Sequence, residues 1–383
     1  MVKEKWISTH IKDIATIYGR IGFRGYTKQD IVKPGFGAIS LSPSNIKDGK
    51  VTYAPATYIS WEKYEESPEI KLTDGDVVLV KTGSTFGKTA YIDRLPWPTT
   101  LNPQIVVFKK LKIHAKLFAY FMASKNIQEQ ISAVIVGGAI PTLSQEQVYA
   151  FDIVYPPDAK EQAAIAEALS DIDSLISSLQ QLIEKKKAIK KGAMQELLTG
   201  KKRLPGFSEE WAYRRVGEIC SITKGQIITE KTAIHGNVPV IAGGKTPAFY
   251  HNVANRESDV ITISASGANA GYIAYHDYPI FASDCSTIES SDQYDVKFIY
   301  YALLYHQQEL IGMQTGGAQP HIHPKEIGVL LVPRINQEEQ RAIANVLSDM
   351  DSEIEQLEKK LAKYQQIKQG MMQELLIGRI RLV

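Results

Sequence analysis

Apolar residues recur at alternating intervals of four and three positions along two long segments of the chain. In the first segment these positions are Ile165, Leu169, Ile172, Ile176, Leu179 and Ile183. In the second segment they are Ile343, Leu347, Met350, Ile354, Leu357 and Leu361, and Tyr364 continues the series. An average spacing of 3.5 residues is typical of a coiled-coil seam. The pattern therefore predicts two long helices, each with the other as its partner.

The two predicted helices are copies of one another. Residues 161–200 and 339–378 are identical at 22 of 40 positions without a gap. Their ends carry boundary signals, a capping-box pair at each start and a glycine at each end. These residues are Asp158 with Glu161, Asn336 with Glu339, Gly200 and Gly378. About 41 residues of helix extend roughly 60 Å, so the helices are long enough to separate two domains.

The remaining segments have shorter apolar runs that predict compact domains. VVLVK, QIVVF and FDIVY before the first helix, and VITIS and VLLVP before the second, are typical of strands. Each segment also contains one helical stretch, HAKLFAYFMASKNIQEQI or VKFIYYALLYHQQELI. Short strands with a single helix predict an α+β domain in each segment. The chain is thus expected to be a domain at 1–157, a helix at 158–200, a domain at 201–335 and a helix at 336–383.

The repeat extends into the two globular segments. A glycine-framed turn, GSTFG at 83–87, recurs as GANAG at 267–271, and GGAIP at 137–141 recurs as GGAQP at 316–320. Trp6 near the start of the first segment matches Trp211 near the start of the second. The offsets between these matches differ, so we expect loops of different length on a shared framework.

The first glycine turn lies in KTGSTFGKTAY, which has some features of a nucleotide-binding P-loop. A P-loop has four residues between its glycines and a helix after them, whereas this turn has three and a β-branched, aromatic continuation. Lys88, the phosphate-binding lysine of such a loop, is replaced by Tyr272 in the second copy. The glycines therefore predict a strand–turn–strand hairpin that needs positive φ.

Composition sets only loose limits on function. The 383 residues include 44 Lys and Arg against 42 Asp and Glu, a net charge of +2, so any basic surface must be local. Two cysteines, Cys220 and Cys285, are too few for a disulfide framework. The start MVKEKWISTHIK has no apolar core of a signal peptide, and the run AVIVGGAI is too short to span a bilayer. We expect a cytoplasmic protein without a membrane partner.

Signatures of catalysis are missing from the sequence. We find no G-x-S-x-G, no H-E-x-x-H and no glycine-rich turn of the dinucleotide or adenosylmethionine type. Residues 102–105 match only part of the Asn-Pro-Pro-aromatic corner of adenine methyltransferases. His321 and His323 have no further Cys or His at a spacing that would complete a metal site. The chain is therefore predicted to be neither an enzyme nor a metal protein.

Side chains suited to DNA are dense around the hairpins and the glycine-rich turns. Asn, Gln, Arg and Lys pair with base edges, and Ser and Thr reach phosphates. The DNA-binding candidates are Arg20, Arg24, Lys81, Thr82, Ser84, Lys88, Asn102, Gln104, Lys224, Lys245, Ser264, Ser266, Asn269, Tyr272, Gln319 and His321. Ordinary solvated loops contain the same residue types. Residues 184–203 carry eight Lys or Arg against two Glu, a run that suits a solvated helix face, a phosphate backbone or an acidic partner.

With these residues in view, the chain resembles the specificity subunit of type I restriction-modification systems over essentially its whole length. The resemblance is carried by the two E-Q-x-A-I-A…L-S-D-x-D-S helices with their M-Q-E-L-L-x-G ends, the entry from Pro157 to Gln162 and the segment G-G-A-Q-P-H-I at 316–322. It implies two target-recognition domains, each reading half of a bipartite site in double-stranded DNA. It also implies that the two helices form an antiparallel coiled coil that holds these domains apart.

The same resemblance implies partners and cofactors. Two modification subunits would bring S-adenosylmethionine and methylate adenine N6, and restriction subunits would use ATP and Mg for cleavage; this chain itself would bind no cofactor. Two alternatives are a self-contained methyltransferase or nuclease and a coiled-coil adaptor with no DNA role. The missing adenosylmethionine loop argues against the first. The diverged domains on matching helices argue against the second.

Overall fold

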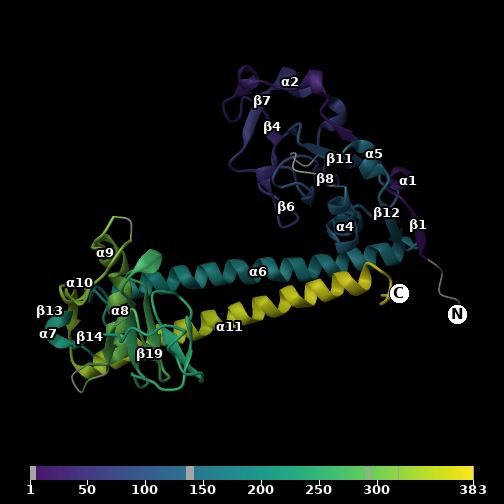
Figure 1. Cartoon of the computed structure of the whole chain (residues 1–383). Coiled ribbons are helices and arrows are strands. Elements are labelled where there is room, and N and C mark those ends of the chain that lie inside the picture. Colours follow the sequence, from purple (N-terminus) through teal and green to yellow (C-terminus); the bar gives the residue numbers. More distant parts are fainter. Residues whose placement is uncertain (1–5, 135–141, 290, 292–293, 318, 383) are drawn as a thin grey trace. The chain divides into compact units, whose positions relative to one another are not determined.

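The computed structural model describes residues 6–134, 142–289, 291, 294–317 and 319–382. The chain forms two compact units, one made of residues 1–178 with 361–383 and the other of residues 179–360. The long helices α6 (Ala159–Leu197) and α11 (Gln337–Leu375) are shared between them. Each unit therefore contains one globular domain, the start of one long helix and the end of the other (Figure 1).

The first domain contains two four-stranded sheets. One is antiparallel with the order β2-β11-β8-β9, and the other has the order β10-β4-β7-β3, in which only β10 and β4 are parallel. Two antiparallel pairs, β1-β12 and β5-β6, complete it. The strands are β1 (Ile7–His10), β2 (Thr16–Gly19), β3 (Ile31–Val32), β4 (Gly37–Leu41), β5 (Ile46–Lys47), β6 (Lys50–Val51), β7 (Thr57–Ser60), β8 (Val77–Val80), β9 (Thr89–Tyr91), β10 (Thr99–Leu101), β11 (Ile105–Lys109) and β12 (Asp152–Tyr155). The helices are α1 (Ile11–Ile14), α2 (Trp61–Glu65), α3 (Ala115–Ala123), α4 (Lys125–Ala133) and α5 (Gln145–Tyr149).

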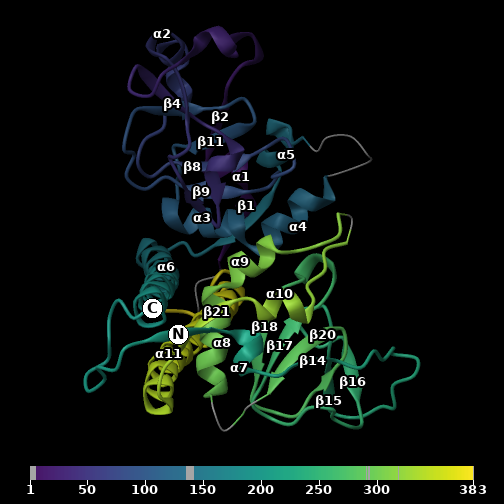
Figure 2. The same cartoon turned by 90° about the vertical axis from the view of Figure 1, so that its left-hand side faces the viewer.

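The second domain repeats the first sheet and alters the second (Figure 2). The repeated sheet has the order β14-β20-β17-β18, and the altered one has three strands in the order β16-β15-β19. The pair β13-β21 corresponds to β1-β12. The strands are β13 (Ala212–Arg215), β14 (Ile222–Lys224), β15 (Val238–Ile241), β16 (Phe249–His251), β17 (Val260–Ser264), β18 (Ile273–His276), β19 (Phe281–Ala282), β20 (Cys285–Glu289) and β21 (Leu331–Arg334). The helices are α7 (Val216–Ile219), α8 (Val296–Tyr305), α9 (Gln307–Gly312) and α10 (Pro324–Gly328).

Both glycine-framed turns are hairpin turns, as the sequence predicts. β8 pairs antiparallel with β9, and β17 pairs antiparallel with β18. All four framing glycines have positive φ, 107° and 83° in the first hairpin and 78° and 83° in the second. Because a side chain is strained in this region of φ, the glycines are retained while Lys88 of the first turn is replaced in the second.

The single helix expected in each domain is wrong, because each of these stretches forms two helices. In the first domain α3 ends and α4 begins at Ser124, whose φ of −70° and ψ of 156° are extended. In the second domain His306, with φ −88° and ψ 6°, separates α8 from α9. The apolar pattern continues across both breaks, so it did not show them.

The ends of the long helices contribute to the domain cores. In the first unit, Ile165 and Leu169 of α6, Leu375 at the end of α11 and the following Leu376 lie in one core with the sheet residues. The corresponding residues of the second unit are Ile343, Leu347, Leu197 and Leu198. The first two seam positions of each helix are therefore shared with a domain core. The spacing alone did not indicate this, because a core and a partner helix select apolar residues at the same intervals.

The middle positions of the seam differ in their burial. Ile172, Leu179, Ile183 and Ile354 are buried, whereas the remaining seam residues Ile176, Met350, Leu357 and Leu361 are half-buried. In the second unit the ion pairs Lys187–Glu358 and Lys190–Asp351 join the helices, so that a later residue of α6 pairs with an earlier residue of α11. The helix segments of this unit are therefore antiparallel.

Candidate nucleic-acid interface

The first domain brings three predicted residues together where β8 ends and β11 begins. The Lys81 N–H donates to the carbonyl of Gln104 (2.8 Å), and the Gln104 N–H donates to Oδ1 of Asn102 (2.9 Å). Nδ2 of Asn102 donates to the hydroxyl of Tyr26 (3.0 Å), which fixes the orientation of the amide. The side chain of Gln104 is exposed, so it is the free amide of this cluster.

The hairpin turn beside this cluster presents the other first-domain candidates. Thr82 forms an isolated antiparallel bridge with Thr142, and Ser84 and Lys88 are exposed at the turn. The glycine-rich segment at 137–141 lies outside the described residues.

The prediction that Arg20 contacts DNA is wrong, because its side chain is buried and bonded within the domain. Its side chain is buried, with the residue 5% exposed; Nε donates to the Leu101 carbonyl (3.0 Å) and Nη2 to the Thr100 hydroxyl (3.2 Å). Arg24 in the same loop lies 3.5 Å from the Glu69 carboxylate. Both sets of partners come from distant parts of the chain, so the local sequence gave no sign of them.

The second domain has a corresponding cluster with different chemistry. The Ser266 hydroxyl donates to the carboxylate of Asp284, and the backbone of Ser266 forms a bridge with His321. Ser264 is buried and its hydroxyl donates to the Gly243 carbonyl (3.2 Å). A carboxylate therefore lies where the first domain has amides, and carboxylates accept from cytosine N4 whereas amides suit adenine.

The rim of this cluster holds the remaining second-domain candidates. Lys245 is exposed, with Nζ 5.6 Å from the ring centroid of Tyr272. The Tyr272 N–H donates to the carbonyl of Asn269 (2.9 Å), which closes the hairpin turn. Gln319 is exposed, and the ring of His321 is stacked with that of His323 at 6.1 Å.

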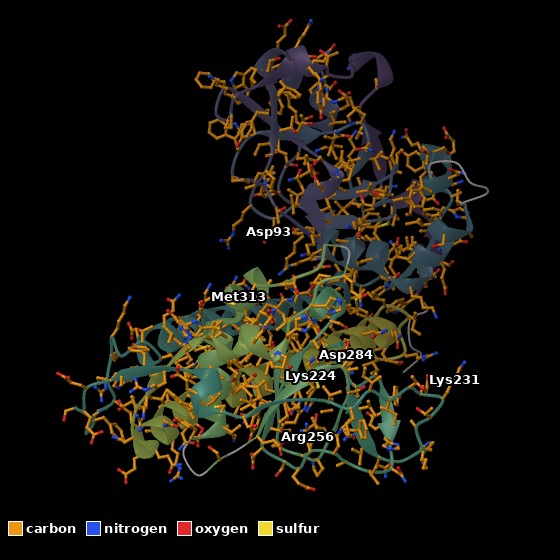
Figure 3. The ribbon with its side chains drawn as sticks, turned by 60° about the vertical axis from the view of Figure 1, so that its left-hand side comes forward. Asp93, Lys224, Lys231, Arg256, Asp284 and Met313 are labelled. Atoms are coloured by element: carbon orange, nitrogen blue, oxygen red, sulfur yellow. The ribbon has the colours of Figure 1, made fainter. Side chains whose placement is uncertain are left out.

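Lys224 lies outside this rim, on the neighbouring strand β14. Its carbonyl accepts from Nη2 of Arg256 (3.2 Å), whose Nε donates to the hydroxyl of Thr287 (2.9 Å) on β20. Lys224 is exposed, and Figure 3 labels it together with Arg256 in the second unit. Arg256, which the sequence analysis did not select, therefore holds this edge of the sheet.

Four of the eight basic residues at 184–203 pair with α11, three of them on α6 and the fourth, Arg203, after it. Lys186 lies 2.6 Å from Glu353, Lys187 lies 2.8 Å from Glu358, and Lys190 pairs with Asp351. These contacts favour the interpretation as a helix–helix surface over a continuous track for a phosphate backbone.

In each unit a buried ion pair joins the start of one long helix to the segment that follows the other. In the second unit Nε and Nη2 of Arg203 donate to the two carboxylate oxygens of Glu339 at 2.7 and 2.8 Å. In the first unit Arg381 donates in the same two-pronged way to Glu161. Both carboxylates are fully buried. Asp158 and Asn336 cap the starts of the two long helices. The glutamates of the predicted capping boxes, Glu161 and Glu339, instead bind the arginine in the segment that follows the opposite helix.

Each arginine lies over a tryptophan at the start of a domain. Arg203 is 5.3 Å from the Trp211 ring, and Arg381 is 6.0 Å from the Trp6 ring. Gly200 and Gly378, with φ of 71° and 72°, pass so close to these rings that an added Cβ would lie 3.0 or 2.9 Å from them. The repeated tryptophans and the closing glycines of the sequence therefore pack against each other, Trp211 on Gly200 and Trp6 on Gly378.

The glutamine of each E-Q pair links the helix to the domain. Oε1 of Gln162 accepts from the His114 N–H (2.8 Å), and its Nε2 donates to the Pro156 carbonyl (2.8 Å). Gln340 accepts from the Asp295 N–H at 2.9 Å in the same way. His114 and Asp295 are the N-caps of α3 and α8. The E-Q sequence therefore encodes the junction between domain and helices.

The family model described as the type I restriction modification DNA specificity domain matches residues 3–188 and 208–369. The chain belongs to this family. It is 25% identical over 412 residues, covering 100% of this chain and 95% of the relative, to the putative type I restriction enzyme MjaX specificity subunit of Methanocaldococcus jannaschii. A putative type I specificity subunit of Mycoplasma genitalium is 24% identical, covering 78% of this chain and 80% of its own length.

The solved structures agree with the fold. The crystal structure of a type I restriction-modification S subunit from M. genitalium has a TM-score of 0.70 at 19% identity and covers 98% of this chain and 97% of its own. The resemblance seen in the sequence is confirmed, and so is an α+β fold with two specificity domains in tandem. The chain is a DNA sequence-recognition subunit of a type I restriction-modification system.

Several residues of this specificity subunit were missed by the sequence analysis. Asp284, Tyr26 and Gly243 complete the two clusters, and only tertiary contacts bring them there. Within the described part of the chain, no group of three His, Cys, Asp or Glu side chains could hold a metal ion. None of the helices in that part is long and apolar enough to cross a membrane.

Proposed function

We propose that each globular domain reads one half of a bipartite DNA target and that α6 and α11 set the distance between the halves. The observation that carries this proposal is the contrast between the junctions and the loops. The Arg–Glu–Trp and Gln contacts recur in both halves, whereas the clusters at the hairpins differ. A protein that places two different readers in equivalent positions needs this combination of a constant frame and variable loops.

We further propose that the chain performs no chemistry. Two modification subunits supply S-adenosylmethionine and methylate adenine N6, taking the target base out of the duplex. Restriction subunits supply ATP and Mg for cleavage. The support is the lack of an adenosylmethionine loop in the sequence and of a phosphate-binding lysine in the second hairpin. The purified chain alone should neither methylate DNA nor hydrolyse ATP.

The test is selection of targets from random DNA with the modification subunit present. Gln104→Ala should relax the preference at one half-site, and Lys245→Ala should weaken contact with the other half-site only. A bidentate contact to a base contributes about 1–3 kcal/mol of discrimination. Lys359→Ala, on the exposed ion pair with Glu355, is the control. Selection of no DNA site by the wild-type complex would support the adaptor alternative, and methylation by the chain alone would support a self-contained enzyme.

A further inference from the structure

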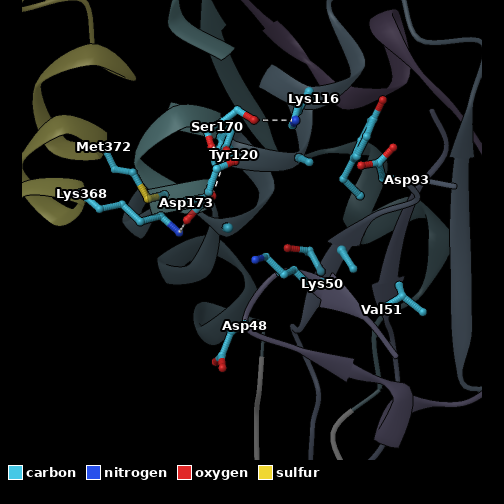
Figure 4. A pocket seen from close by; sticks show the side chains of 17 residues that line it. Asp48, Lys50, Val51, Asp93, Lys116, Tyr120, Ser170, Asp173, Lys368 and Met372 are labelled. Carbon is cyan, nitrogen blue, oxygen red and sulfur yellow. Dashed lines mark hydrogen bonds and ion pairs between the residues drawn. The ribbon is translucent and has the colours of Figure 1, made fainter. Parts of the chain in front are cut away.

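A tyrosine, an aspartate and a lysine from three different helices meet in the first unit. The hydroxyl of Tyr120 on α3 donates to Oδ2 of Asp173 on α6 (2.8 Å), and Nζ of Lys368 on α11 lies 2.6 Å from Oδ1 of the same carboxylate (Figure 4). One carboxylate therefore connects a helix of the recognition domain to both long helices. We call these three residues the first Tyr–Asp–Lys triad.

The second unit contains the same triad with the long helices exchanged. The hydroxyl of Tyr301 on α8 donates to Oδ2 of Asp351 on α11 (2.8 Å), and Lys190 of α6 pairs with Oδ1 of Asp351. Asp173 and Asp351 are 178 residues apart, as are Lys190 and Lys368, which is the offset of the helix repeat. The triads are thus related by the internal repeat although the recognition domains have diverged.

The chemistry of the triads favours a directional link. Burial, followed by the nearby carboxylate, raises the pKa of both Tyr120 and Tyr301, so each phenol stays protonated and donates a hydrogen bond to the aspartate. The side chains of Asp173 and Lys368 are 25% and 28% exposed, and hydrogen bonds to a charged acceptor are stronger than neutral ones when water is partly excluded. The aspartate cannot satisfy both donors unless α3 or α8 keeps its position on the helix pair.

We propose that the two Tyr–Asp–Lys triads are positioning residues that fix the setting of each recognition domain on the long helices and thereby the spacer length that the subunit accepts. This inference rests on the proposed bipartite reading. The Arg–Glu pairs hold the helix ends, and the Gln contacts hold the start of α3 and α8. The tyrosine of each triad is the sixth residue of α3 or α8. Its hydrogen bond therefore prevents the short helix from rotating about the contact that the glutamine makes at its start.

The experiment uses the full chain in complex with its modification subunit and a set of DNA duplexes that carry the selected half-sites with spacers from two base pairs shorter to two longer. Tyr301→Phe and Tyr120→Phe remove only the hydroxyl. Each should reduce the preference for the natural spacer over its neighbours by about tenfold, the scale of one hydrogen bond to a charged group. The preferred bases of both half-sites should stay the same.

Three further variants separate positioning from folding. Tyr300→Phe removes the hydroxyl of the adjacent tyrosine on α8 and should leave the spacer preference within twofold of wild type. Asp351→Asn should lower the spacer preference, and the exchanged pair Lys190→Asp with Asp351→Lys should leave it lowered. The exchange restores the attraction between α6 and α11, but a lysine at 351 offers no acceptor for the Tyr301 hydroxyl.

The inference is overturned if the triad variants keep the wild-type spacer preference. It is also overturned if they weaken binding equally at every spacer, which would show a role in stability alone. A wild-type complex with no spacer optimum would instead contradict the proposed function, and that result is visible before any variant is measured.

Discussion

The two halves of the subunit have equivalent contacts at their junctions and different residues in the hairpin clusters that we propose to read DNA. Glu161, Gln162 and Asp173 of the first half recur as Glu339, Gln340 and Asp351, each with an equivalent partner. At the position of the exposed amide Gln104 in the first domain, the second domain has the carboxylate of Asp284, which accepts from Ser266. The constant residues hold each domain on the long helices, and under the proposed function the variable residues would determine what the domain reads.

The divergence is concentrated away from the long helices. The sheet that contains the glycine-framed hairpin has four strands in both domains, whereas the other sheet has four strands in the first and three in the second. The hairpin β5-β6 belongs to the first domain. Recognition domains of different build are thus attached to the same junction, which suggests that they can be exchanged as units.

The most severe test of the comparison is to delete one half. A fragment from residue 211 to the end should form a two-fold symmetric dimer, because its partner offers substitutes for the lost contacts. Arg381 and Lys368 of the second copy would take the places of Arg203 and Lys190 at Glu339 and Asp351. Such a dimer should select a palindromic bipartite site whose two arms are the half-site that the second domain reads.

The fragment is checked by its mass in solution and by selection from random DNA with the modification subunit. Glu339→Ala in the fragment should weaken the dimer, because Arg381 then has no carboxylate to bind. A stable monomer, or selection of an asymmetric site, would show that the halves are not interchangeable.

A second test changes the length of both helices. Deleting seven residues from each near 178 and 356 turns the remainder by about 700°, close to two full turns, and shortens the separation by roughly 10 Å. Because the seam stays in register, this deletion should retain more binding than a deletion of three residues, measured over targets whose spacers are shortened one base pair at a time, each step changing the separation by about 3.4 Å and the rotation by about 34°. Deleting three residues turns the helices by about 300° and should abolish binding, because the apolar seam no longer matches. Equal tolerance of both deletions, measured over a series of spacers, would argue against the helices as a ruler.

The sequence predicted the frame of the molecule far better than its reading surfaces. Repetition and heptad spacing gave the helices, the hairpins and the family, because these features depend on local geometry and apolar periodicity. Arg20 was misjudged, since its acceptors Leu101 and Thr100 are 80 residues away. Asp284 was missed for the same reason. The function of the E-Q pairs was also hidden, because their partners come from other parts of the chain.

Loss of either buried Arg–Glu ion pair should lower the free energy of unfolding by a similar, intermediate amount in the two halves. Removing one partner of a buried pair leaves an uncompensated charge and costs about 3 kcal/mol. Arg203→Ala and Arg381→Ala should each destabilise their own unit by this amount, although Arg381 is near the end of the chain. Hydrogen exchange assigned to each unit measures the loss separately. Arg379→Ala is the control, because its contact with Glu374 is exposed. A small effect of Arg381→Ala alone would show that the first junction is weaker than the second.

The smallest predicted difference between the two halves is the loss of stability of their hairpins at acid pH. His276 on β18 is buried and its Nε2 lies 2.9 Å from the hydroxyl of Thr262 on β17, whereas the equivalent residues of the first domain are Ile92 and Val78, both fully buried. Burial lowers the pKa of His276 below the ordinary 6.5, only partly offset by Asp277. In the first domain partial desolvation and Lys116 also lower the pKa of His114, although the residue as a whole is exposed to solvent.

As the pH falls, the unfolded chain therefore binds a proton at His276 before the folded chain does, and the free energy of unfolding decreases below about pH 6.5. Hydrogen exchange of β17 and β18 should accelerate between pH 7 and pH 5, after correction for intrinsic rates, more than exchange of β8 and β9. The double variant Thr262→Val with His276→Ile reproduces the first-domain pair and should remove this excess. If the two hairpins respond alike before the substitution, the buried histidine does not distinguish the halves. If the excess survives the substitution, another group in the second domain carries the proton.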